Sequence, residues 1–126
     1  MWRWTDITFG GKLYLRRLHI VQTPWFAVML HWLKSADPQR DLHDHPVSFL
    51  SIPLRGGYVE ENATGTKAIS LLCWNWKRAT DTHRITHVQH NTLTLVICGP
   101  VVRPWGFHTA RGFIPWREYE KVGDKL

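Results

Sequence analysis

Short runs of hydrophobic, β-branched and aromatic residues recur from Lys12 onward, and Gly, Pro, Asp or Asn bounds most of them. This pattern is typical of strands joined by turns. It predicts strands over residues 12–22, 25–34, 45–54, 57–61, 68–77, 82–89 and 92–98, with a further short strand near Phe107. No window has the helical spacing of apolar residues over three turns, so the chain is predicted to be all-β.

Residues 1–126 are the size of one ordinary domain, and no linker, repeat or low-complexity segment divides them. Many short strands in one small domain predict a sandwich or a closed barrel, because both arrangements protect the edges of sheets. Most of the eight tryptophans are expected in the core or in the barrel wall. Residues 120–126 are expected to form a frayed tail.

The net charge of +6 favours anionic partners in general. The basic residues are dispersed, so nucleic acid is compatible with the composition but is not favoured by it. No segment resembles a signal peptide, and the longest apolar run, "WFAVMLHWL", is too short for a membrane span. We expect a cytoplasmic protein without a membrane partner, in which Cys73 and Cys98 are buried free thiols.

The segment "DLHDHP" places His43 and His45 two residues apart at the start of a predicted strand. Side chains alternate in a strand, so both imidazoles point the same way and Asp44 points to the opposite face. Two histidines alone are weak evidence for a metal. In "THRITHVQHN", however, His83 and His87 are predicted to share a face, and an antiparallel pairing could bring His83 beside the first two histidines.

These residues resemble the two motifs of the cupin superfamily. In "HDHPVSFLSIPLRGG", the two histidines and Gly56 match the first motif, and Phe49 stands where the family has a glutamate. In "RATDTHRITH", His83 matches the histidine of the second motif, while Arg78, Thr80 and His87 replace its proline, glycine and asparagine.

The resemblance implies a single-domain cupin-like β-barrel, also called a double-stranded β-helix or jelly roll. It also implies one divalent metal ion on His43, His45 and His83, with Fe(II) favoured and Zn, Mn or Ni as alternatives. Some cupins have a purely structural role, so the histidines could also bind nothing. The family includes many dimers, which makes a homodimer one candidate assembly.

Further side chains are candidates for the chemistry around such an ion. Tyr58 or His87 could transfer protons, but the first could equally be a packing residue, and the second could be a fourth ligand, a partner of a ligand or a core histidine. Glu60 and Glu61 could supply a carboxylate, although a solvated turn is the preferred interpretation. Three residues are predicted to bind substrate: Arg103, Arg78 and Trp105, with Arg84 nearby. Arg103 interrupts an apolar run, so it binds an anion, pairs with a protein carboxylate or stacks on Trp105.

Two classes of function remain open from the sequence. The first is a mononuclear non-haem iron oxygenase that acts on a small anionic substrate, with an isomerase as the second reaction class. The alternative is a non-catalytic cupin module that binds a nucleotide, a sugar or another small anionic ligand.

Overall fold

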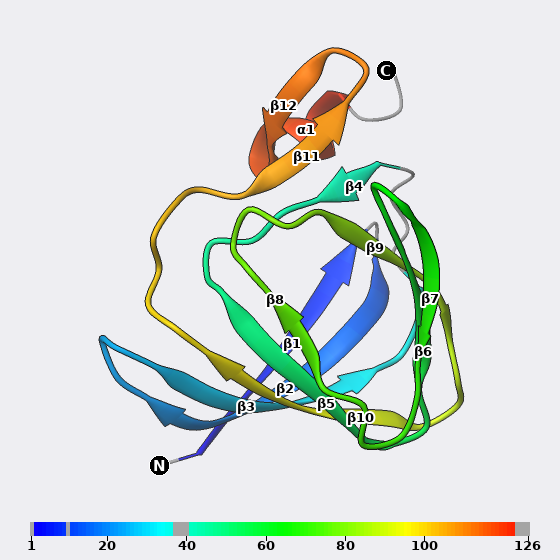
Figure 1. Ribbon diagram of the computed structural model, residues 1–126. Helices are drawn as coiled ribbons and strands as arrows, with labels where there is room; N and C mark the ends of the chain where they lie inside the picture. The colour runs from blue at the N-terminus through cyan, green and yellow to red at the C-terminus, as the bar shows by residue number, and fades with distance from the viewer. Residues whose placement is uncertain (1, 10, 37–40, 123–126) are drawn as a thin grey trace.

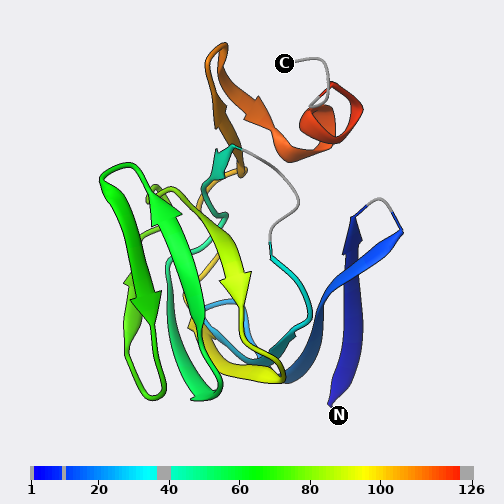
Figure 2. The ribbon, with the colours of Figure 1, turned by 90° about the vertical axis from the view of Figure 1, so that its right-hand side faces the viewer.

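Two antiparallel six-stranded sheets curve around a shared interior (Figures 1 and 2). The computed structural model describes residues 2–9, 11–36 and 41–122. The first sheet has the strand order β1 (Arg3–Phe9), β2 (Lys12–Gln22), β3 (Ala27–Leu33), β10 (Thr92–Cys98), β5 (Phe49–Arg55) and β8 (Asn75–Lys77). The second has the order β12 (Gly112–Pro115), β11 (Gly106–Thr109), β4 (Leu42–His43), β9 (His83–Val88), β6 (Tyr58–Asn62) and β7 (Gly65–Ile69). The helix α1 (Trp116–Val122) packs on β11 and β12.

The prediction of an all-β chain is confirmed, and β2 and β10 have the predicted bounds. The predicted strand 68–77 is wrong as one element, because β7 and β8 belong to different sheets. Leu72 between them has a φ of 61°, and Cys73 N donates to Ser70 O at 3.0 Å, so the chain turns there. The largely apolar run "LLCWNW" hid this turn.

Three elements near the ends of the chain were not predicted. β1 precedes the first predicted strand, β12 follows the last one, and α1 is shorter than the three turns needed for a helical pattern. The expected tail 120–126 is partly wrong, since residues 120–122 belong to α1, and residues 123–126 lie outside the described residues. Along the described segments, no helix has the length and hydropathy required to cross a membrane.

The core lies between the sheets. One cluster joins Leu15 and Leu33 of the first sheet to Tyr58 and Ile85 of the second. A second cluster is formed within the first sheet by the following residues: Ala27, Met29, Val96 and Cys98. These contacts identify the inward side of the strands that contribute to the two clusters, because side chains alternate between the two faces.

Gly56 turns the chain between β5 and β6 with a φ of 73°. A Cβ at this position would lie 2.5 Å from Thr92 Oγ1, and that hydroxyl accepts a hydrogen bond from Gly57 N at 3.1 Å. The turn therefore needs glycine for its backbone conformation and for its close approach to β10. Gly56, the glycine of the first cupin-like motif, therefore determines where the chain turns from β5 into β6.

Asp44 connects the histidine segment to the C-terminal hairpin of β11 and β12. Its buried carboxylate accepts hydrogen bonds from Gly106 N at 2.9 Å and from His108 Nε2 at 2.8 Å, and it lies 2.6 Å from Arg103 Nη1. The prediction that Asp44 points away from the paired histidines is confirmed by these partners. These three partners belong to the hairpin and to the segment before it, so the Asp44 carboxylate anchors the hairpin to β4.

We predict that Asp44→Asn lowers the free energy of unfolding by about 3 kcal/mol, because it leaves Arg103 without its carboxylate partner. Urea denaturation followed by tryptophan fluorescence measures this loss. Asp6→Asn is the matched control, since Asp6 pairs with Arg16 at 2.9 Å on the surface. The expected cost of this substitution is small, because solvent screens an exposed ion pair. Equal effects of the two substitutions would contradict the anchoring role of Asp44.

Candidate metal centre

Three histidines converge at the inner side of the second sheet. His43 on β4 is the cross-strand neighbour of His83 on β9, and His45 follows two residues later. One ring nitrogen from each histidine lies within 4.8 Å of the others, and the Nε2 atoms of His45 and His83 are 3.1 Å apart. The predicted convergence of His43, His45 and His83 is confirmed.

The backbone around His45 fixes the position of this imidazole. His45 N donates a hydrogen bond to Ala79 O at 3.0 Å, and Ala79 N donates to Ser48 Oγ at 3.0 Å. Val102 N donates to Pro46 O at 2.8 Å. These bonds connect the loop after β4 to segments that are distant in sequence, so the loop is held in place although it is not part of a strand.

Aromatic rings surround the histidines. Phe49, which occupies the position of the cupin glutamate, has its ring centroid 4.7 Å from that of His45. The rings of Trp105 and Phe107 lie 5.9 Å and 5.8 Å from His43. Among the described residues, no aspartate or glutamate joins the three histidines at metal-ligand distance. The centre is therefore a set of three imidazoles with apolar walls.

His87 does not join this group. Val59 pairs with His87 and Glu60 pairs with Ile85, so Thr86 is an extra residue in β9. Such a β-bulge reverses the alternation of side chains. His83 and Ile85 are buried, whereas His87 is exposed and its Nδ1 lies 3.2 Å from Thr86 Oγ1. The prediction that His87 shares the inner face is wrong for this reason.

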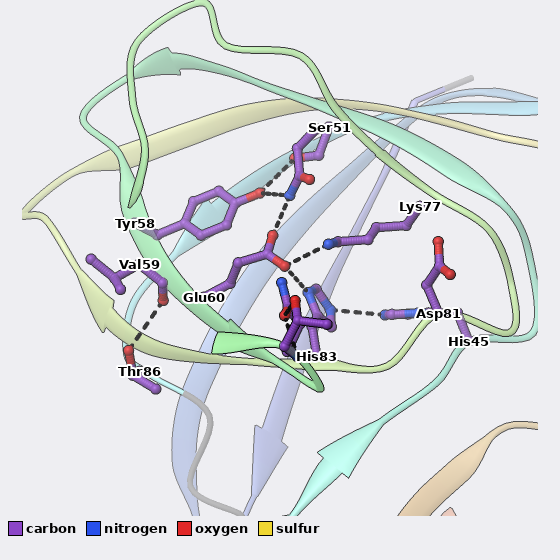
Figure 3. A network of polar contacts seen from close by, with 12 residues as sticks. His45, Ser51, Tyr58, Val59, Glu60, Lys77, Asp81, His83 and Thr86 are labelled. Carbon is purple, nitrogen blue, oxygen red and sulfur yellow. Dashed lines mark hydrogen bonds and ion pairs between the residues drawn. The ribbon is translucent and has the colours of Figure 1, made fainter. Parts of the chain in front are cut away.

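Glu60 is a second residue that sequence reasoning placed incorrectly. We expected a solvated turn, but the Glu60 side chain is completely buried in β6. One carboxylate oxygen, Oε2, lies 3.5 Å from His83 Nδ1 and 2.5 Å from Lys77 Nζ (Figure 3). The other, Oε1, accepts a hydrogen bond from Asn75 Nδ2 at 2.6 Å. The alternation of Tyr58, Glu60 and Asn62 in "GGYVEEN" was the available signal for an inward carboxylate.

Tyr58 belongs to the same buried network. Its hydroxyl accepts a hydrogen bond from Asn75 Nδ2 at 2.9 Å and donates to Ser51 Oγ at 3.5 Å (Figure 3). Burial is the main reason why the pKa of the Tyr58 hydroxyl is raised above its ordinary value. A hydroxyl that stays protonated and hydrogen-bonded orients Asn75, so the structure connects Tyr58 to the histidines only through Asn75 and Glu60.

The charges of the network explain the protonation states around the centre. Burial alone would raise the pKa of Glu60, but hydrogen bonds from His83 and Lys77 lower it to about 2. Burial, followed by the nearby charges of His83, His43 and Lys77, lowers the pKa of His45 well below its usual value. Glu60 is therefore ionised, and His45 is neutral with a lone pair available for a metal ion.

The residues present fit a divalent metal ion. Bonds from nitrogen to a metal are about 2.0–2.1 Å long, so neighbouring ligand atoms lie roughly 3 Å apart, close to the separation of the His45 and His83 Nε2 atoms. A metal-bound histidine usually donates its other ring N–H to a carboxylate or a carbonyl group. Glu60 stands in that position behind His83. The site would hold the ion through His43, His45 and His83.

The predicted substrate-binding residues lie in different environments. Arg103 is paired with Asp44, which is the protein-carboxylate alternative considered for it. Arg78 is exposed and lies 3.5 Å from Asp81. Trp105 lies against His43 and stacks on Trp116 with the two planes at 10°. The described contacts therefore place only Trp105 beside the centre.

A second inward-facing polar group, Arg17 and His31, was not predicted. The two residues are cross-strand neighbours on β2 and β3, and Arg17 Nε donates to His31 Nε2 at 2.9 Å. The signal was the alternation with Leu15 and Leu33, which places both residues on the core side of the first sheet.

Comparisons with known proteins support the fold. No protein-family model matches the sequence, and no curated protein does so either. An RmlC-like cupin from Shewanella frigidimarina NCIMB 400 has a TM-score of 0.59 at 13% identity, over 79% of this chain and 84% of that chain. KdgF from a Halomonas species has a TM-score of 0.59 at 13% identity, over 79% and 89% of the respective chains. Fe(II) HppE has a TM-score of 0.61 at 10% identity, over 78% of this chain and 56% of that chain. The chain therefore has the cupin fold.

We predict that Glu60→Gln and Lys77→Met each lower the free energy of unfolding by about 3–5 kcal/mol, because each leaves one buried charge unpaired. The double variant should lose clearly less than the sum. The double variant should also bind a divalent metal roughly 10–100-fold more weakly than the wild type, since the hydrogen bond that orients His83 is changed.

Urea denaturation and metal titration of all three variants measure these effects. Glu61→Gln is the control, because Glu61 is a half-exposed neighbour that lies 3.7 Å from Arg84. Additive effects of the two substitutions on stability would show that Glu60 and Lys77 do not act as a pair.

Proposed function

We propose that this protein is a metal-dependent enzyme that holds one divalent ion on His43, His45 and His83. The observation that carries the proposal is the convergence of three imidazoles, one of which has a buried carboxylate at its second nitrogen. Three protein ligands with an open position are typical of catalytic metal sites. Structural sites are usually closed by four protein ligands, and Phe49 occupies the place where a fourth ligand would be expected.

The preferred reaction class is a mononuclear non-haem iron oxygenase with a small anionic substrate. Fe(II) is the first choice of metal, because a structure with this fold, HppE, is described with Fe(II). When bound, the ion supplies Lewis acidity and, for iron, activation of dioxygen. Three neutral ligands leave its charge uncompensated, which favours an anionic substrate.

The protein side chains have distinct parts in this proposal. Glu60 holds His83 in the tautomer whose Nε2 lone pair points into the site, and Lys77 keeps Glu60 ionised. Tyr58 is assigned a positioning role through Asn75. Phe49 and Trp105 exclude water from the two sides of the histidine group and present apolar surface to the substrate.

We predict that untagged protein purified without oxygen contains close to one equivalent of metal per chain. His45→Ala should lose most of it, because two imidazoles bind a divalent ion much more weakly than three. Elemental analysis measures the content and also identifies the metal. His90→Ala is the matched control, since His90 is exposed and follows the end of β9.

Oxygen uptake in the presence of a panel of small carboxylates and phosphates then separates the two classes of function. Uptake that requires both metal and His45 supports the oxygenase. Metal binding with ligand capture but without turnover of any compound would support the non-catalytic module. Metal-free wild-type protein, or full metal content in His45→Ala, would contradict the proposed centre.

A further inference from the structure

Arg17 is an inward-facing cation whose only side-chain hydrogen bond in the described residues is to His31. Its register neighbours, Thr5 on β1 and His31 on β3, carry no negative charge. The Arg17 guanidinium donates to the Nε2 lone pair of His31, which requires the neutral imidazole. Burial and then the charge of Arg17 keep the pKa of His31 well below its usual value.

No carboxylate forms an ion pair with Arg17 in the part of the chain that the structure describes. The neighbouring residue Arg16 points to the opposite face and binds both oxygens of Asp6, at 2.9 Å and 3.2 Å. A partly buried cation without an anion is costly, because the protein interior solvates charge poorly. The position is therefore suited to a charge that a ligand would bring.

Arg17 and the metal centre share the interior between the two sheets. The register places Arg17 in one row with His31 and with Thr94 of β10. Cys98, four residues further along β10, lies on the same face and is the register partner of Phe49. The ring of Phe49 contacts the imidazole of His45, with the ring centroids 4.7 Å apart. The inner face of β10 and β5 therefore connects the row of Arg17 with the histidines.

We propose that Arg17 binds the anionic group of the small substrate, a carboxylate or a phosphate, whose other end reaches the three histidines. This inference rests on the proposed function and identifies the charge that the substrate must carry. His31 positions the guanidinium by accepting its Nε–H, which leaves the two terminal nitrogens available for a bidentate contact with anion oxygens. The apolar residues between the two groups, Phe49 among them, would contact the middle of the substrate.

The test compares Arg17→Met with Arg16→Met, two adjacent arginines on opposite faces of β2. Calorimetry with inorganic phosphate and with succinate, at constant ionic strength, should show binding at least about tenfold weaker in Arg17→Met. Arg16→Met should bind both anions within about twofold of the wild type, because its arginine is outside the barrel. Equal affinities in wild type and Arg17→Met, equal losses in both variants, or no anion binding by the wild type would each overturn the inference.

Two further measurements identify the cause of a failure. Urea denaturation should show Arg17→Met at least as stable as the wild type, since an unpaired buried charge is removed. A marked loss of stability would make Arg17 a structural residue and overturn the proposal. Metal content is measured in the same samples: absent metal in the wild type contradicts the proposed function, whereas full metal with unchanged anion affinity contradicts only the role of Arg17.

Discussion

The placement of Asp44 is the constraint on which the rest of the histidine centre depends. Its carboxylate lies between two predicted ligands in sequence but on the other side of the chain, where a backbone amide, a histidine and an arginine bind it. Because β4 has only two residues, the sheet alone holds this segment weakly. Asp44 supplies the missing restraint, and His43 and His45 point inward as a result.

Opposite Asp44, the centre is supported by a second carboxylate with a different environment. Glu60 is balanced by Lys77 and reaches His83, so the pair adds orientation to the site without adding net charge. The chain thus separates two tasks that a glutamate ligand would combine, namely the positioning of an imidazole and the neutralisation of an ion. Arg17, on the first sheet, adds positive charge to the same interior.

Local patterns in the sequence were sufficient for much of the fold. Alternation predicted β2 and β10 with their bounds, and the resemblance to the two cupin motifs predicted the histidine centre and the turn after β5. The split of β7 from β8 was hidden because an apolar run does not reveal a residue with positive φ. The partners of Glu60 and Arg103 could not be predicted, because pairing depends on which strands become neighbours.

The bulge at Thr86 shows how one residue determines the composition of the centre. The chain contains a fourth histidine on β9, and its type would suit a metal ion, yet the extra residue turns it to the solvent. Which histidine of β9 faces the interior is therefore set by the parity of the strand and not by residue type.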